Sequence, residues 1–238
     1  MHYFWIILII AAASLLKGIT GFGFALFSLP LLMNWYSPKE LIPVLVFCNL
    51  FSSVIIILQK KERKLVNKEA GNLIAYAGFF TLIGVVVLKN ISDTLLVTIM
   101  SISFIIMALF SILKVNRSFR FKNSTYKIAG MFLGILTGSI SVSGPPLALF
   151  LNSAKVDKQE FREIFAWFSV VTAVIALAGY FGAGLIMPQM MKTTLLILPI
   201  LFAGTYLGKR LNNTMQPELF RNITIVITIF SSILLLIK

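Results

Sequence analysis

Two clusters of small and hydroxyl residues interrupt long apolar stretches of this 238-residue chain, and both are suited to binding a small anion. They are residues 18–23 (GITGFG) and residues 138–146 (GSISVSGPP). Runs of glycine, serine and proline do not propagate a helix, so each cluster predicts a break. A helix that restarts near Phe24 or near Pro145 presents unpaired N–H groups and a positive dipole end. Lys17, directly before the first break, would add a full positive charge.

The residues predicted to bind substrate lie in the two breaks and at two polar positions inside apolar stretches. Asn49 and Ser169 are costly in lipid, so they should face the protein interior. Ser143 is placed to cap the second restarted helix. The full predicted set is Lys17, Thr20, Gly21, Gly23, Phe24, Asn49, Ser141, Ser143, Gly144, Pro145 and Ser169.

The same residues also have purely structural interpretations, which the sequence leaves open. Glycines in membrane helices often permit close packing. The Lys17 side chain is long enough to snorkel to the membrane interface. Asn49 and Ser169 would serve equally well as hydrogen-bonding contacts between helices, and Cys48 is most simply a small buried apolar residue.

Groups that perform acid–base, redox or metal chemistry are scarce. The chain has one histidine, His2, and one cysteine, Cys48, so we expect no disulfide framework, metal cluster or cofactor. The carboxylates fall in loops or at the ends of apolar stretches, which disfavours a membrane-embedded proton relay and an intramembrane enzyme. These carboxylates are Glu40, Glu62, Glu69, Asp93, Asp157, Glu160, Glu163 and Glu218.

Composition indicates that this chain resides in a lipid bilayer. Hydrophobic residues make up 58% of it and charged residues 12%, against roughly 45–50% and about 25% in soluble domains. The net charge of +13 comes from basic residues in the gaps between apolar stretches, so no nucleic-acid partner is expected. We therefore predict an all-α polytopic membrane protein. Its apolar stretches are 3–33, 41–58, 70–88, 95–113, 126–151, 161–181, 190–208 and 219–237.

The two halves of the chain resemble each other at a fixed offset of 120 residues. Gly18 corresponds to Gly138, and Lys89 corresponds to Lys209. Each half begins with a long broken stretch and continues with three single spans. This order predicts one membrane domain built from two repeats, residues 1–118 and 119–238.

The positive charges favour a hairpin over a crossing at each break. If each broken stretch returns to the side it entered, the loops 59–69, 114–127, 152–162 and 209–221 share one side. They carry five, five, three and three Lys or Arg residues, whereas the opposite side keeps four. The positive-inside rule then places these loops in the cytoplasm and both termini outside. An odd number of crossings per half inverts the second repeat, which is a secondary-transporter architecture.

The sequence around both breaks resembles the sulfite exporter TauE/SafE family of membrane permeases. The likeness rests on residues 17–25 with Leu29-Pro30, and on Gly134, Gly138 and residues 143–146. It extends over essentially the whole chain and implies transport of small sulfur-containing anions such as sulfite, sulfoacetate and isethionate. The second cluster is richer in serine than the usual glycine-rich version, and serine hydroxyls can donate to a sulfonate.

We therefore expect a permease that works by alternating access at a midplane site between the two hairpins. An interior-negative potential drives anions outward by about 2.3 kcal/mol per charge per 100 mV, so export is the expected direction in the absence of a coupling carboxylate. The expected partners are the anion and the lipid bilayer, and a homo-oligomer stays open. An anion channel, an organic-anion carrier unrelated to sulfur and a non-transporting scaffold are the alternatives.

Overall fold

The structure, a computed structural model, is helical in the part of the chain that it describes. The described residues are 2–20, 23–58, 67–112, 121–154, 158–186 and 188–211, with the single positions 156, 226, 229 and 233. The helices are α1 (His2–Thr20), α2 (Phe24–Leu32), α3 (Pro38–Leu58), α4 (Lys68–Asn90), α5 (Asp93–Ile112), α6 (Asn123–Ile140), α7 (Gly144–Ser153), α8 (Lys158–Ala183) and α9 (Pro188–Leu211). The predicted single spans 41–58, 70–88, 95–113, 161–181 and 190–208 correspond to α3, α4, α5, α8 and α9. The last predicted stretch, 219–237, lies almost wholly outside the described residues.

The helices expose many large apolar side chains on their outer faces, where a bilayer would cover them. On α4, Phe79 and Val86 are 66% and 58% exposed, whereas Thr81 is fully buried. Three segments within the described residues are long and apolar enough to cross a membrane: Pro38–Ile55, Lys68–Asn90 and Glu163–Ala183. Lipid can cover the exposed apolar faces, and helices satisfy their backbone polar groups internally. The all-α membrane fold expected from the sequence is confirmed.

Both predicted breaks are present, and each separates a long helix from a short one. Helix α1 has 19 residues and α2 has nine. Gly23, which directly precedes α2, has a φ of 98°. Helix α6 has 18 residues and α7 has ten, and Ser141 ends α6 with a φ of 58°. A positive φ is uncommon for a serine, so the second break imposes local strain on a residue of the predicted site.

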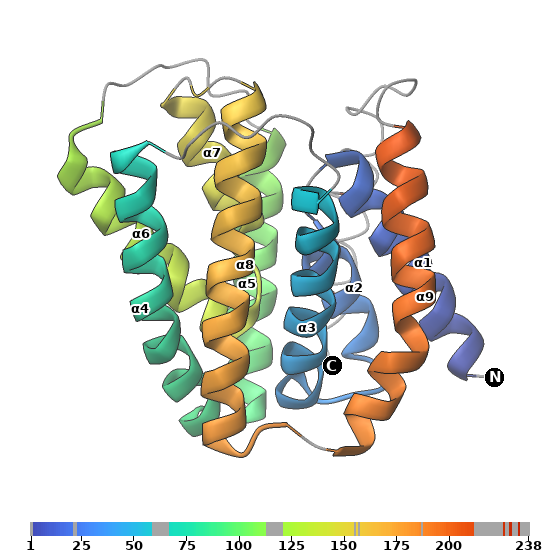
Figure 1. Cartoon of the computed structure of the whole chain (residues 1–238). Helices are drawn as coiled ribbons and strands as arrows, with labels where there is room; N and C mark the ends of the chain where they lie inside the picture. Colours follow the sequence, from blue (N-terminus) through green and yellow to red (C-terminus); the bar gives the residue numbers. More distant parts are fainter. Residues whose placement is uncertain are drawn as a thin grey trace.

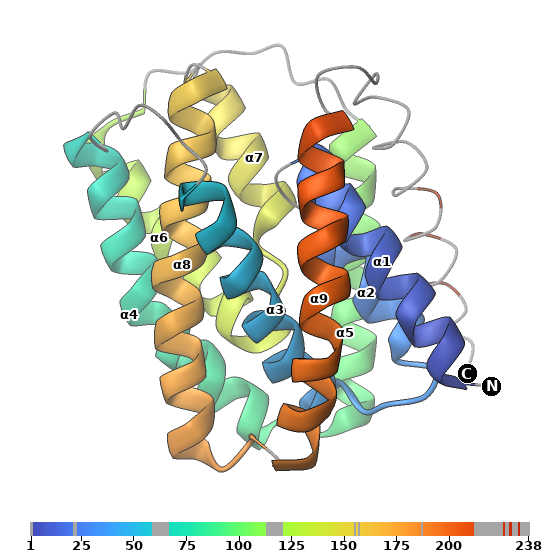
Figure 2. The ribbon, with the colours of Figure 1, turned by 45° about the vertical axis from the view of Figure 1, so that its right-hand side comes forward.

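The path of the chain brings each hairpin back to the end of the bundle where it starts. In Figures 1 and 2, α1 begins at the lower end, and after α2 the chain is again at this end, where α3 begins. Helix α6 begins at the upper end, and α7 returns the chain to the upper end, where α8 begins. The two hairpins thus enter the bundle from opposite ends.

A glycine face on α6 allows the backbones of α4 and α6 to approach closely. Gly130, Gly134 and Gly138 follow one another at intervals of four residues and lie directly against the backbone of α4. A Cβ atom at Gly138 would lie 2.1 Å from the carbonyl oxygen of Thr81. Helices in lipid associate through such small residues because the backbones can approach closely.

Helices α1 and α9 pair in the same way, and they are the counterparts of α6 and α4 at the 120-residue offset. A Cβ atom at Gly18 would lie 2.4 Å from the carbonyl oxygen of Thr205, and one at Gly208 would lie 2.2 Å from that of Leu15. For Gly18 and Gly138 the packing interpretation is therefore the right one. These two glycines shape the hairpins rather than contact a ligand.

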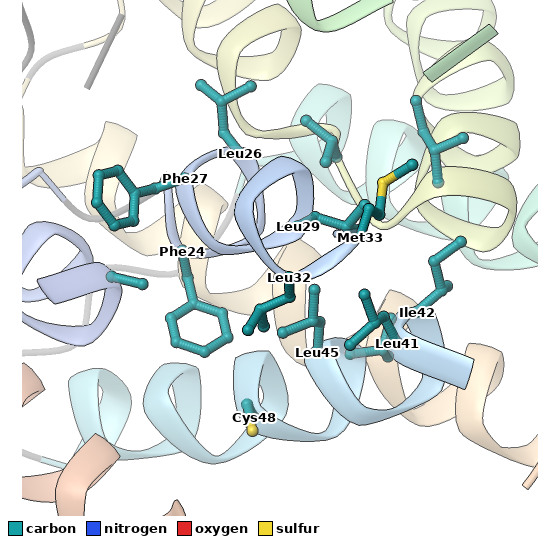
Figure 3. Packing of buried hydrophobic residues seen from close by; sticks show 14 of the residues in the cluster. Phe24, Leu26, Phe27, Leu29, Leu32, Met33, Leu41, Ile42, Leu45 and Cys48 are labelled. Atoms are coloured by element: carbon teal, nitrogen blue, oxygen red, sulfur yellow. The ribbon is translucent and has the colours of Figure 1, made fainter. Parts of the chain in front are cut away.

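An apolar cluster joins the two hairpins to α3 and α8. Phe24, Leu26 and Leu29 of α2 belong to it, together with Ile140 and Val142, which flank Ser141 at the second break. Figure 3 shows Phe24 and Leu32 of α2 pointing toward the face of α3 that carries Leu45 and Cys48. The described residues that flank both breaks therefore belong to one packed apolar cluster, and Cys48 is a small buried residue as expected.

Candidate functional site

Lys17 is the most unusual residue of the described structure, because its ammonium group lies inside the bundle. Its side chain is 1% exposed. The Nζ atom donates to the backbone oxygen of Asn49 at 2.9 Å and to the Oγ atoms of Ser52 and Ser53, each at 3.1 Å. It also donates to Oδ1 of Asn49. The snorkelling interpretation of Lys17 is therefore wrong. Lys17 and Asn49, which were predicted separately as site residues, are in direct contact.

The two serines orient their oxygen lone pairs toward Lys17. Ser52 donates its hydroxyl hydrogen to the carbonyl oxygen of Cys48 at 2.6 Å, and Ser53 donates to that of Asn49 at 2.8 Å. A hydroxyl has one hydrogen, so both oxygens are left as acceptors for the ammonium. Neither serine was among the site residues predicted from the sequence. Their signal was the spacing 49, 52 and 53, which places three polar side chains on one face of α3.

Within the described residues, no carboxylate lies within ion-pair distance of Lys17. The only other buried charged side chain described is Glu163, in the second turn of α8. The neutral oxygens of α3 solvate the ammonium without cancelling its charge. A buried cation without an anionic partner is costly in a membrane, and a small anion would compensate it.

The second break contributes a buried hydroxyl that has no hydrogen-bond partner among the described residues. The Oγ atom of Ser141 is buried and forms no hydrogen bond in the described part of the chain. Ser143 precedes α7 at the N-cap position, as predicted, but its side chain makes no capping bond. Its Oγ instead shares a hydrogen bond of 2.8 Å with the hydroxyl of Thr137, so capping by the Ser143 side chain was a wrong expectation. The backbone oxygen of Ser143 does accept the first helical bond of α7, from Leu147.

Proline limits how many donors the start of α7 can offer. The helix begins at Gly144 and continues with Pro145 and Pro146, and a proline has no N–H. Of the four N–H positions that usually point out of a helix start, only those of Ser143 and Gly144 carry hydrogen. The positive dipole end remains, so hydroxyls and dipole dominate at this break.

The first break offers a fuller set of backbone donors. Helix α2 begins at Phe24, and the N–H of Phe27 bonds to the carbonyl of Gly23. The N–H groups of Gly23, Phe24 and Ala25 have no acceptor within α2. The Phe24 side chain is 2% exposed and packs in the apolar cluster, so this residue can offer a ligand only its backbone. Thr20 closes α1; its side chain and all of Gly21 lie outside the described residues.

Polar residues occupy equivalent places in the two halves. The offset of 120 relates Lys17 to Thr137, Asn49 to Ser169, and Ser52 to Thr172. Ser169 and Thr172 are buried on α8, which packs against α3. Thr172 donates to the carbonyl of Phe168 at 2.7 Å. Lys17 is charged, whereas Thr137 at the matching position of the second half is neutral. The positive charge of the predicted site therefore comes from the first half.

Comparisons with known proteins agree on a transporter. A family model described as "Sulfite exporter TauE/SafE" matches residues 6–235. A curated relative, the "Probable inner membrane transporter protein TsaS" of Comamonas testosteroni, is 31% identical over 110 residues. This match covers 46% of each chain, so the similarity spans about half of that relative. No solved structure matches the chain.

Proposed function

Because the chain belongs to the sulfite exporter TauE/SafE family, whose model covers residues 6–235, we propose that it is a permease for a small sulfur-containing anion. The proposed substrate is sulfite or an organosulfonate such as isethionate or sulfoacetate. The observation that carries the proposal is the buried ammonium of Lys17, which has no carboxylate partner among the described residues and lies one turn before the first break.

The proposed binding site lies between the two breaks. On the first hairpin, the backbone donors around Gly23 and the charge of Lys17 attract the anion. On the second hairpin, the N–H of Gly144 and the hydroxyl of Ser141, which has no partner among the described residues, complete the site. A sulfonate has three acceptor oxygens, so it can accept from both hairpins at once.

The proposed mechanism is alternating access between two inverted repeats, residues 1–118 and 119–238. The matching pairs of helices support this: α1 packs on α9 as α6 packs on α4, and each pair meets at glycines. A rocking motion of one repeat against the other would open the site to one side at a time. The membrane potential drives a bound anion outward, so export is the proposed direction.

The proposed location is the cytoplasmic membrane, with the basic loops inside and both termini outside. Asn67 and Ser92 are both exposed and precede α4 and α5 at opposite ends of the bundle. In a background in which Cys48 is replaced by alanine, we expect a cysteine at Ser92 to react with an impermeant thiol reagent on intact cells. A cysteine at Asn67 should react only after lysis. The reverse pattern would invert the topology.

The substrate class is tested by thermal stabilisation of the purified protein with sulfite, sulfate, isethionate, sulfoacetate, taurine, acetate and phosphate. A ligand that binds only the native state adds about 2.7 kcal/mol at a hundredfold excess over its Kd. We expect stabilisation by sulfite or by one or two sulfonates, and little by acetate or phosphate. Equal responses to all seven compounds, or none, would remove the sulfur assignment.

A further inference from the structure

The ammonium of Lys17 is fully engaged before any substrate arrives. An ammonium has three N–H donors, and four oxygen atoms of α3 lie within hydrogen-bonding distance. No N–H is left over for an anion in this arrangement. An anion can therefore bind Lys17 only by displacing one of these four oxygens.

The four oxygens differ in how easily they can leave. The backbone oxygen of Asn49 is fixed within α3, and the hydroxyls of Ser52 and Ser53 are tied to carbonyl oxygens by bonds of 2.6 and 2.8 Å. The Oδ1 atom of Asn49 is at the end of a rotatable side chain, and Asn49 is only partly buried. It is the one acceptor that can move away without disturbing the helix.

Rotation of the Asn49 carboxamide would also create a ligand for the anion. Because an ammonium can only donate, the oxygen of the carboxamide faces Lys17 and the NH2 group faces away. The Nδ2 atom has no hydrogen bond within the described residues. A half-turn of the amide replaces the oxygen by two N–H donors, which suit a sulfonate or sulfite oxygen.

We propose that the Asn49 side chain is an internal ligand that substrate displaces from Lys17, while Ser52 and Ser53 are positioning residues that keep the ammonium in place. Without substrate, the carboxamide oxygen occupies one donor of the ammonium. When the anion binds, it takes over this donor, and the rotated amide donates to it. This inference rests on the proposed anion permease. It adds which group binds Lys17 without substrate and which group the anion replaces.

Two substitutions at Asn49 should act in opposite directions. Asn49→Asp keeps the size of the side chain but places a carboxylate against the ammonium, which substrate must then displace as a competing anion. We expect its half-saturation concentration for the responding anion to rise at least tenfold. Asn49→Ala removes the displaceable oxygen, so we expect a half-saturation concentration equal to or below that of the wild type, with a lower maximal rate because the amide donors are lost. A purely structural role would weaken binding in both variants.

Matched controls separate this effect from charge and from folding. Asn90→Asp adds the same charge at an exposed position whose amide donates to Val86, and it should bind like the wild type. Ser14→Ala removes a buried hydroxyl that donates to Ile10 and is not one of the hydrogen-bond partners of Lys17. This variant measures how much the melting temperature falls when a buried hydroxyl bond is lost. The unliganded melting temperature of Asn49→Asp should not fall below that of the wild type, because an ion pair replaces a neutral contact.

The readouts are ligand-induced thermal shift with isethionate and sulfite, and saturation of their flux in proteoliposomes. If the wild type responds but Asn49→Asp binds with unchanged affinity, the displacement model is wrong and the permease stands. If Asn49→Ala weakens binding as much as Asn49→Asp does, Asn49 is a fixed ligand and the displacement model is again overturned. If the wild type responds to no sulfur-containing anion, the proposed substrate class and the displacement model both fall.

Discussion

Replacement of Lys17 by methionine should weaken binding of the sulfur-containing anion by about 100-fold or more. The substitution shortens the side chain by one atom and leaves the bound anion without a positive partner. Breaking a buried charge pair by removing one partner costs about 3–5 kcal/mol, and about 1.4 kcal/mol corresponds to a factor of ten. The measurement is the half-saturation concentration for isethionate or sulfite in the thermal-shift titration.

The matched control for Lys17→Met is Lys39→Met. Lys39 is also on the N-terminal half of the chain, but it forms an ion pair with Asp93 at 3.4 Å, and its side chain is 27% exposed. Removing this charge should leave the half-saturation concentration within about twofold, because exposed ion pairs contribute about 0–1 kcal/mol. If Lys17→Met folds and binds the anion like the wild type, the buried ammonium is not part of the site.

Substitution of Gly138 by alanine should strongly destabilise the fold. The new Cβ atom would lie 2.1 Å from the carbonyl oxygen of Thr81 and 3.0 Å from the backbone nitrogen of Val85. Backbone atoms cannot rotate away as a side chain can, so α4 and α6 would have to separate. Overpacking typically costs about 1–3 kcal/mol, and we expect a value at or above the top of this range. The melting temperature of the detergent-solubilised protein measures it.

Gly71→Ala provides the comparison for the same chemical change at an open position. Gly71 lies in the first turn of α4, and nothing approaches the position of its Cβ within 4 Å. Alanine favours a helix by about 1 kcal/mol relative to glycine, so this variant should be as stable as the wild type or slightly more so. If Gly138→Ala is as stable as Gly71→Ala, the close approach of α4 and α6 is wrong.

The sequence predicted the breaks well because their cause is local. Glycine, serine and proline oppose a helix whatever surrounds them, and the helices restart at Phe24 and Gly144, at or one residue from the predicted positions. In contrast, the sequence could not predict where the Lys17 ammonium lies, because its position depends on residues that are distant in the sequence. A long side chain reaches either the interface or a neighbouring helix, and only the fold places the oxygens of Asn49 and Ser52 within its reach.

The pairing of distant helices was also beyond the sequence. Nothing local to Gly18 or Gly138 distinguishes a glycine that packs from one that lines a site, because both uses need the absence of a side chain. The structure separates them: Gly18 and Gly138 lie against neighbouring backbones, whereas Gly23 is needed for its positive φ. The bonding of Ser143 differed from expectation because its hydroxyl bonds to Thr137 in the last turn of α6, across the break.

The most direct test of the account is counterflow of radiolabelled isethionate and sulfite in proteoliposomes that contain the purified protein. We expect uptake that saturates with concentration, that is accelerated when the same unlabelled anion is inside, and that is lost in liposomes with the Lys17→Met variant. Flux equal to that of empty liposomes for both anions would contradict a sulfur-anion permease. Flux that rises without saturation and ignores the internal anion would indicate a channel instead of a carrier.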